Sequence, residues 1–381
     1  MVQLAEKPSD GAADPALDRR FMRAAIGFGR RALGQTAPNP SVGALVVSGG
    51  VVVGRGLTRP GGRPHAETEA LAQAGARARG ATLYVSLEPC SHTGLTPPCA
   101  QAIIEAGIAR VVSSLDDPDP RVAGRGHAMM RAAGIDVVTG VETAAARQAH
   151  LGHILRVTEG RPFVTLKLAE TADGYAAGDI HDGRLMITGR AANNRVQTMR
   201  AAHDAIMVGI GTALADDPLL TVRLPGMEGR KPLRVLLDGS LAIPHNSRLL
   251  ATCSSHPLLV LCAEGVSESA RATVAAFGAE VVAVAAEAGR RISLAAALQA
   301  LGARGVTRVF SEGGPKVGSG LIRAGLADEV VLFTSPKPIG REGVPVLTKE
   351  ARRILLSNAG YDLVEDGQAG NDRMRIWRRR G

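Results

Sequence analysis

The chain has 381 residues, 45% of them hydrophobic and 21% charged, a composition typical of a globular protein. This length exceeds the size at which one hydrophobic core usually stops growing, so we expect two domains. No apolar run approaches the roughly 18 to 20 residues of a membrane-spanning helix, and acidic residues lie where a signal peptide would be apolar. The sequence therefore predicts a cytoplasmic protein without a membrane partner.

The net charge is +9, and five arginines lie within the last nine residues. Such a balance suits anionic partners, either a phosphorylated small molecule or a nucleic acid. With one Trp, three Tyr and six Phe, the chain has few side chains for base stacking. We therefore expect a small phosphorylated ligand and no nucleic acid, and we expect the Arg-rich end to be a solvated terminus.

The first 150 residues alternate between helical and strand patterns. Apolar residues at helical spacing predict a helix over 18–33, and two Val-rich segments around a Gly-rich turn predict a hairpin over 44–53. Strands that alternate with helices indicate an α/β sheet covered on both faces. The further predicted elements are helices over 65–76, 99–107 and 125–133 and strands over 82–87, 110–114 and 135–138.

A helical pattern over 144–162 breaks at Gly160 and Pro162, and we place the domain boundary there. The predicted domains are residues 16–150 and 160–381. Seven strand candidates follow the break, enough for a second complete α/β domain. They cover 163–168, 205–208, 233–237, 258–262, 280–284, 308–310 and 329–334, and Cys253 and Cys262 beside the fourth are expected to be buried.

The strongest chemical signal is His65-Ala-Glu67 followed by Pro89-Cys90 and Cys99. One imidazole and two thiolates suit a tetrahedral zinc that keeps its fourth position for water, and Glu67 is placed to carry protons. The zinc-deaminase signature H-x-E…P-C-x-x-C differs only in the longer spacing between the cysteines. The alternative is a structural zinc with His92 as the fourth ligand. Prolines before His65 and Cys99 predict that both begin helices.

Together with Pro38-Asn-Pro-Ser-Val-Gly43, Thr96-Pro-Pro-Cys99 and Val122-Ala-Gly-Arg-Gly126, these motifs resemble the bifunctional deaminase/reductases of riboflavin biosynthesis. The resemblance implies a cytidine-deaminase-like αβα sandwich that holds one Zn²⁺. It implies hydrolytic deamination of 2,5-diamino-6-(5-phosphoribosylamino)pyrimidin-4-one, with Asn39 and His92 lining the pyrimidine pocket. Asp119 is a departure, since the family often has Asn there.

The segments 166–169, 171–174, 211–223, 311–315 and 336–340 resemble the reductase half of the same family. The resemblance implies a dihydrofolate-reductase-like domain that uses NADPH to reduce the ribosyl group to a ribityl chain, and a homo-oligomer, either dimer or tetramer. The implied cofactor contacts are Ala169, Met186, Thr212, Asp216, Gly314, Pro315, Lys316, Val317, Gly318, Ser319 and Gly320. The implied contacts of the reductase substrate are Arg184, Arg200, Leu220, Arg223 and Glu312.

The residues of the second half support these roles less strongly by themselves. The Gly-rich turn after Glu312 could hold a cofactor phosphate at a helix start, or it could be a plain tight turn. Arg200 and Arg223 could clamp a phosphate, although a single helical Arg often lies on a solvated face. Arg184 and Met186 depart from the family's Ser and Trp. Two alternatives therefore stay open: a nucleic-acid deaminase with a binding domain, and a cofactor-free scaffold that dimerises the deaminase.

Overall fold

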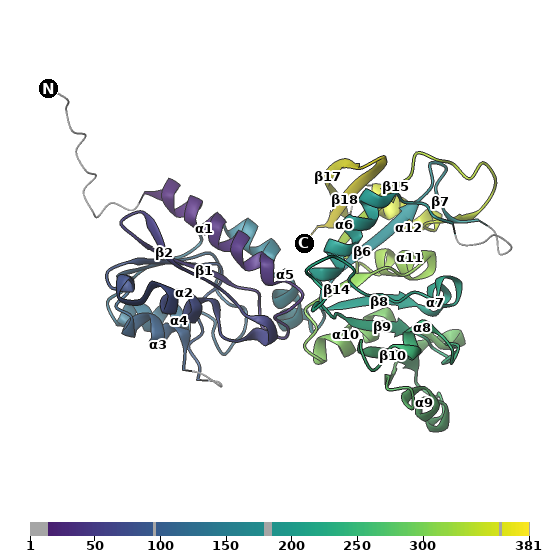
Figure 1. The fold of residues 1–381 in the computed structure, drawn as a ribbon, viewed down its shortest axis with the longest axis horizontal. Coiled ribbons are helices and arrows are strands. Elements are labelled where there is room, and N and C mark those ends of the chain that lie inside the picture. Colours follow the sequence, from purple (N-terminus) through teal and green to yellow (C-terminus); the bar gives the residue numbers. More distant parts are fainter. Residues whose placement is uncertain (1–13, 94–96, 179–184, 358–359, 381) are drawn as a thin grey trace. The chain divides into compact units, whose positions relative to one another are not determined.

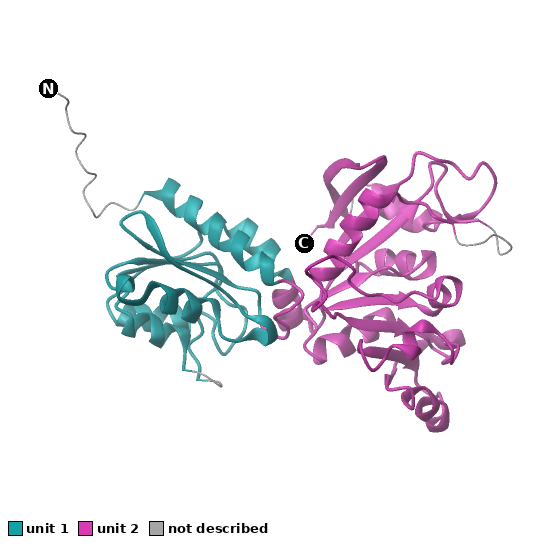
Figure 2. Ribbon diagram, in the orientation of Figure 1, with its two compact units in different colours: residues 1–32, 40–151 teal, residues 33–39, 152–381 magenta. Residues whose placement is uncertain are grey.

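The computed structural model describes residues 14–93, 97–178, 185–357 and 360–380. The chain forms two compact units, the first made of Met1–Ala32 and Pro40–Leu151 and the second of Leu33–Asn39 and Gly152–Gly381 (Figure 2). Figure 1 shows their elements in chain order. In the part of the chain described, no helix is both long and apolar enough to cross a membrane.

The first unit is a five-stranded sheet between two layers of helices, which confirms the predicted αβα sandwich. Strand β1 is antiparallel to both its neighbours, whereas β3, β4 and β5 are parallel. Buried side chains of α1 (Pro15–Gly29) and α5 (Thr143–Glu159) pack on one face. Those of α2 (Ala66–Ala74), α3 (Cys99–Glu105) and α4 (Arg125–Ala132) pack on the other. The sheet order is β2 (Val51–Leu57), β1 (Gly43–Ser48), β3 (Thr82–Val85), β4 (Arg110–Ser113) and β5 (Asp136–Val138).

Two glycines of β2 let the backbone of α2 lie directly on the sheet. A Cβ atom at Gly54 would overlap the carbonyl oxygen of Ala70, and one at Gly56 would overlap that of Ala66. Any larger residue would push α2 outward, because main-chain atoms cannot move aside as a flexible side chain can. These glycines therefore fix the position of α2, and with it that of His65 at the N-cap of the helix.

The second unit is built on a nine-stranded sheet, and the seven predicted strands are its seven parallel members. Buried residues of α6, α8 and α9 pack on one face, and those of α10, α11 and α12 pack on the other. The parallel strands are, in sheet order, β11 (Glu280–Val284), β10 (Leu258–Ala263), β9 (Leu233–Leu237), β8 (Ala205–Gly209), β14 (Arg308–Ser311), β6 (Phe163–Glu170) and β15 (Glu329–Thr334). The helices are α6 (Arg190–Ala201), α7 (Ile210–Asp216), α8 (Arg248–Ala251), α9 (Glu268–Ala275), α10 (Leu294–Ala303), α11 (Pro315–Arg323) and α12 (Lys349–Leu356).

The prediction of a solvated C-terminus is wrong. Residues 361–379 form an antiparallel hairpin, β17 (Tyr361–Ala369) and β18 (Asp372–Arg379), and β18 extends the sheet beside β15. Met374, Ile376 and Trp377 of β18 are buried in the core. Each of the five arginines forms an ion pair with a carboxylate: Arg373 with Asp366, Arg375 with Glu170, Arg378 with Glu329, Arg379 with Asp328 and Arg380 with Asp362. This pairing removes one of the two observations that motivated the nucleic-acid alternative, the Arg-rich end, and leaves the net charge of +9.

The sequence pattern also gave no sign of two short strand pairs. Strand β7 (Tyr175–Ala177) pairs with β16 (Val344–Pro345), and β12 (Ala286–Glu287) pairs with β13 (Arg291–Ile292). Segments of two or three residues are too short to show a period of two. Within the described ranges, short 3₁₀ turns lie at Arg30–Ala32, Pro60–Gly62, Gly75–Ala78 and Ala288–Arg290.

The two compact units divide inside α5, between Leu151 and Gly152, nine residues before the end of this helix pattern at Gly160. Ala146 and Ala149 pack into the core of the first unit. From Gly152 onward the helix lies against the second unit, since a Cβ atom there would be 2.6 Å from the carbonyl oxygen of Thr307. Gly160, at φ 69°, ends the helix but does not separate the units.

Candidate active sites

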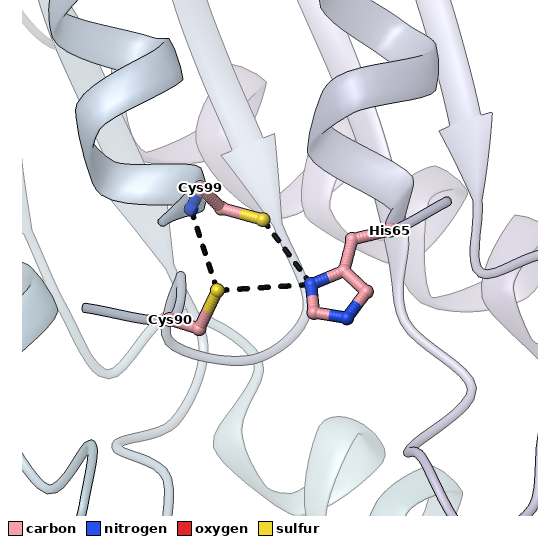
Figure 3. A group of neighbouring side chains, drawn as sticks. All are labelled: His65, Cys90 and Cys99. Atoms are coloured by element: carbon pink, nitrogen blue, oxygen red, sulfur yellow. Dashed lines mark hydrogen bonds between the residues drawn. The ribbon is translucent and has the colours of Figure 1, made fainter. Parts of the chain in front are cut away.

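Three side chains from separate segments of the first unit meet at one point (Figure 3). The Nδ1 atom of His65 lies 3.2 Å from Sγ of Cys99 and 3.7 Å from Sγ of Cys90, and the Cys99 amide donates to Sγ of Cys90 at 3.3 Å. At a tetrahedral zinc, bond lengths of about 2.0 and 2.3 Å place nitrogen and sulfur ligands about 3.6 Å apart. The spacing of these donor atoms therefore fits a zinc ion.

Each of the three donors is placed by the start of a helix or the end of a strand. His65 is the N-cap of α2, and Cys99 is the first residue of α3, which confirms both predicted helix starts. Cys90 follows β3 after a short connection. Among the described residues, no fourth His, Cys, Asp or Glu joins the cluster, His92 included. The donor set thus leaves one tetrahedral position open, which is typical of catalytic rather than structural zinc.

Glu67 lies in the first turn of α2 and is buried, with 3% of its surface exposed. Burial raises the pKa of its carboxyl to about 7, because a carboxylate loses its hydration there. A hydrogen bond from Cys99 lowers the pKa of Cys90 to about 4, and the same interaction raises that of Cys99. A carboxyl group that titrates near neutrality can both accept and donate a proton at physiological pH.

Glu88 begins the segment Glu88-Pro-Cys-Ser-His92, and the sequence indicated no role for it. Its buried carboxylate accepts hydrogen bonds from four backbone amides of the 117–127 loop, those of Asp117, Gly124, Gly126 and His127. Glu88, Asp116 and His127 also have the spacing of a metal site, but the amides already occupy both oxygens of Glu88. Glu88 therefore holds the loop against the Cys90 turn and is not available to a second ion.

The two implied pyrimidine contacts differ in what surrounds them. Nδ1 of His92 is buried and has no hydrogen-bond partner among the described residues, as expected of a donor kept for a ligand. Asn39 belongs to the segment 33–39 of the second unit, and its backbone amide donates a hydrogen bond to the carbonyl of Thr36. Asp119 pairs with Arg121 at 2.5 Å, so its extra charge relative to Asn is locally neutralised. Both pyrimidine contacts stay predictions.

In the second unit, Arg200 of α6 is buried and bonded to Glu312, which excludes the alternative of a solvated helix face. Its Nε and Nη2 atoms donate to the two oxygens of Glu312 at 2.6 and 3.0 Å, and Nη1 donates to the carbonyl of Thr221 at 2.9 Å. Burial opposes ionisation of Glu312, but Arg200, Lys167 and Arg223 outweigh it and hold its pKa below the usual value. Lys167 was missed, although a lysine within a buried strand was a visible signal.

The loop that carries two implied substrate contacts is held by α6. Gln197 accepts a hydrogen bond from the backbone amide of Arg223 at 2.8 Å. Arg200, three residues further along the same helix, donates to the carbonyl of Thr221. Leu220 is buried and has φ 52°, a left-handed conformation that a non-glycine residue adopts only when its surroundings impose it. The side chain of Arg223 is exposed at the end of this loop.

A Gly-rich turn connects β14 to α11, as the sequence predicts. Gly314 is the N-cap of α11, Pro315 is its first residue, and the Gly314 amide donates to Oγ1 of Thr212 at 3.1 Å. A Cβ atom at Gly313 would lie 2.7 Å from the side chain of Val317. The first amides of a helix have no partner within the helix, so this turn offers donors to a phosphate.

The other implied cofactor residues of α11 pack inside the unit. Gly318 approaches Leu168, Gly320 approaches Leu294, and Oγ of Ser319 accepts a hydrogen bond from the amide of Thr348. Lys316 is exposed beside the turn, Ala169 lies in β6 and Asp216 ends α7. Met186 is 69% exposed, and Arg184 lies outside the described residues. As cofactor or substrate contacts these residues stay predictions.

The two units together define a class of enzyme, a zinc-type cytidine deaminase joined to a reductase of the dihydrofolate-reductase type. Residues 15–115 match the cytidine and deoxycytidylate deaminase zinc-binding region, and residues 162–359 match the RibD C-terminal domain. The latter covers more than half of the chain. The chain belongs to the RibD family, the bifunctional deaminase/reductases of riboflavin biosynthesis.

Relatives match along almost the whole chain. The riboflavin biosynthesis protein RibD of Bacillus amyloliquefaciens is 38% identical over 350 residues, 92% of this chain and 91% of that protein. RibD of Escherichia coli is 36% identical over 93% of this chain and 97% of that protein. A crystal structure of a Thermotoga maritima diaminohydroxyphosphoribosylaminopyrimidine deaminase/5-amino-6-(5-phosphoribosylamino)uracil reductase, 33% identical, has a TM-score of 0.81 over 96% of this chain and 99% of that one. The predicted family, fold class and bifunctional activity are confirmed.

Proposed function

We propose that residues 16–150 deaminate 2,5-diamino-6-(5-phosphoribosylamino)pyrimidin-4-one and that residues 160–381 then reduce its ribosyl group with NADPH. The convergence of His65, Cys90 and Cys99 beside the buried Glu67 carries the first assignment. The name of the Thermotoga relative supports the choice of substrate. A small phosphorylated pyrimidine also suits the positive charge of the chain.

For the deamination, His65, Cys90 and Cys99 would hold Zn²⁺, with Cys90 as the more acidic thiol. When bound, zinc supplies a Lewis acid that activates water as a nucleophile. Glu67 takes one proton from the attacking water and delivers it to the ring nitrogen, and then carries the second proton from the added oxygen to the amino group; the C–N bond breaks, ammonia leaves and the ring carbon keeps a carbonyl oxygen. Its buried position excludes bulk water as a competing proton source.

For the reduction, the amides at the start of α11 and Thr212 would hold the cofactor pyrophosphate. NADPH, when bound, supplies the hydride. Arg223 would hold the substrate phosphate, and Glu312, ionised and fixed by Arg200, would accept hydrogen bonds from ribose hydroxyls. Arg200 is occupied by Glu312 and Thr221, so it positions these groups. We also propose a cytoplasmic homo-oligomer, as in the sequence analysis.

A coupled assay on zinc-loaded protein tests both activities. The diaminopyrimidine substrate is added, and ammonia release and NADPH oxidation are followed in parallel. Ammonia release followed by NADPH oxidation supports both assignments, and shows that Met186 is compatible with reduction. Ammonia release without NADPH oxidation would overturn the assignment of the NADPH-dependent reduction. Absence of ammonia release from protein with zinc bound would overturn the proposed identity of the substrate.

A further inference from the structure

The parallel strands of the second unit bring several loops to one edge of its sheet. Because β14, β8, β9 and β10 are parallel neighbours in that order, their loops follow one another along the carboxyl edge. Ligands of open α/β sheets bind at this edge. The loops after β14 and β8 already meet, through the hydrogen bond from Gly314 to Thr212. The next loop along the edge is the one after β9.

The proposed cofactor contact Ala169 gives a direction to a dinucleotide lying along this edge. Ala169 lies in β6, and β6 borders β14 on the side opposite to β8. We place the nicotinamide at Ala169 and the pyrophosphate at the Gly314 turn, so that the adenosine half extends over β8 towards β9. Neighbouring strands are about 4.8 Å apart, so β9 is about 10 Å from β14, a distance that the ribose and a long side chain can span.

The loop after β9 is covered by the tip of the β12–β13 hairpin. A Cβ atom at Gly239 would overlap the carbonyl oxygen of Arg290, and it would lie 3.7 Å from Cβ of Arg290. The carbonyl of Gly239 accepts a hydrogen bond from the amide of Ala263, the last residue of β10. Gly239 thus lets Arg290 rest directly on the carboxyl edge of the sheet.

Arg290 is held there in an unfavourable conformation and with its charge uncompensated. Its φ of 58° is left-handed, which costs a non-glycine residue about 1 to 2 kcal/mol. The nearby carboxylate of Glu287 is taken by Arg291, at 2.7 Å. The exposed guanidinium of Arg290 has no hydrogen-bond or ion-pair partner among the residues that the structure describes. A strained residue with an unpaired cation at a ligand-binding edge indicates a function rather than a packing role.

We infer that Arg290 forms the subsite for the 2′-phosphate of the adenosine ribose, and so selects NADPH over NADH. This inference rests on the NADPH-dependent reduction proposed above. The two cofactors differ only in that phosphate, and a guanidinium can donate two parallel N–H bonds to it. Arg290 would contact a part of the cofactor remote from the hydride, so it affects cofactor affinity and not the chemical step.

Calorimetric titration of the full-length protein with 2′,5′-ADP and with 5′-AMP tests the subsite without catalysis. For Arg290→Ala we expect at least a tenfold rise in Kd for 2′,5′-ADP and less than a twofold change for 5′-AMP, because a charge-assisted hydrogen bond is lost. Arg291→Ala is the matched control from the same hairpin, and both of its Kd values should stay within twofold. Arg290→Lys should lie between wild type and Arg290→Ala.

Kinetics with both dinucleotides complete the test. The KM for NADPH should rise at least tenfold in Arg290→Ala, with kcat and the KM for NADH unchanged. An unchanged Kd for 2′,5′-ADP in Arg290→Ala, or equal losses for both nucleotides, would overturn the subsite while leaving the reductase proposal intact. A wild-type protein that binds and oxidises neither dinucleotide would instead overturn the reductase proposal itself.

Discussion

Arg200 and Glu312 form a two-pronged ion pair, with Nε and Nη2 of the arginine 2.6 and 3.0 Å from the two carboxylate oxygens. Both side chains are nearly buried, at 10% and 13% exposure. The pair links α6 to the turn before α11, and the third bond of Arg200 ties in the loop at Thr221. The groups proposed to contact the reductase substrate are thus parts of one hydrogen-bonded unit.

Arg200→Ala should abolish most of the reductase activity and destabilise the second unit. It leaves the buried Glu312 carboxylate unpaired, a change that costs about 3 to 5 kcal/mol. Calorimetric melting and NADPH oxidation check this, with Arg195→Ala on the exposed side of the same helix as control. Ammonia release should not change. If the losses of unfolding free energy caused by Arg200→Ala and Glu312→Gln were purely additive in a double-mutant cycle, the pairing of the two side chains would be contradicted.

Glu67→Gln should lower the rate of ammonia release about 10²- to 10⁴-fold, the usual contribution of a general acid/base. The zinc content should stay near that of wild type, since Glu67 is not among the three donors. Elemental analysis and the ammonia assay check both parts. Glu69→Gln is the control on the same helix, because Glu69 pairs with Arg59 at the surface and has no role in the site. Loss of zinc from Glu67→Gln would show that the carboxylate helps to bind the metal.

Zinc removal and Cys90→Ser should have the same selective effect. Either change should abolish deamination and leave NADPH-dependent reduction of the deaminated pyrimidine unchanged, because the donors all belong to the first unit. Restoring zinc should rescue the chelated wild-type enzyme but not the variant. Cys253→Ala is the control, since Cys253 is buried in the second unit away from any metal donor set. Retained deamination in a zinc-free preparation would refute the zinc assignment.

Acid should weaken the second unit through His203. Burial lowers the pKa of this imidazole to about 3, and its Nδ1–H donates to the carbonyl of Met199 at 2.6 Å. Between pH 6.5 and 3 the unfolded chain binds a proton that the folded chain does not, so stability falls as the pH falls, by up to about 1.4 kcal/mol per pH unit. Above pH 6.5 the contribution is fully present.

Melting temperatures of wild type and His203→Gln, measured at pH 7.5, 6.5 and 5.5, test this dependence. The variant should be less stable at pH 7.5 but should lose less stability on acidification. His245→Gln, at an exposed histidine of the same unit, should keep the wild-type pH dependence. Parallel curves for wild type and His203→Gln would argue against a neutral buried imidazole at this position.

Truncation after Gly370 should unfold the second unit and abolish NADPH oxidation. It removes β18, whose Met374, Ile376 and Trp377 are buried and whose backbone pairs with β15. The zinc content should stay near that of wild type, because His65, Cys90 and Cys99 all lie in the first unit. Arg380→Ala should change little, because its pair with Asp362 is half exposed and such pairs contribute at most about 1 kcal/mol. Full NADPH oxidation by the truncated chain would show that the hairpin is dispensable.

The sequence predicted most of the fold because its parallel strands are apolar runs that need burial on both faces. It failed at β17 and β18, where charged residues interrupt the apolar ones: Arg373 and Arg375 flank Met374, and Arg378 follows Trp377. A run of arginines carries no local sign of its partners, since Glu170 and Glu329 are far away in the sequence. The long-range pairing of β18 with β15 supplies them.

The residues of the candidate sites also differ in whether the sequence could predict them. His65, Glu67, Cys90 and Cys99 could be found because zinc chemistry restricts both residue type and spacing. Glu88 could not, because its role lies in accepting amides from a loop about 30 residues later, which needs the folded backbone. The contacts of Arg200 could not be predicted for a similar reason. Helical periodicity says which face a residue occupies, but only tertiary packing decides whether that face meets Glu312.

The segment Leu33–Asn39 belongs to the second unit although the residues on both sides of it belong to the first. It is fixed there by bonds from Arg230 to the carbonyl of Leu33 and from Arg156 to that of Pro38. No single cut of the gene can therefore yield two intact monofunctional proteins. If the chain were divided within α5, between Leu151 and Gly152, the reductase fragment would lack these seven residues. The deaminase fragment would carry them, but without Arg156 and Arg230, to which they bond.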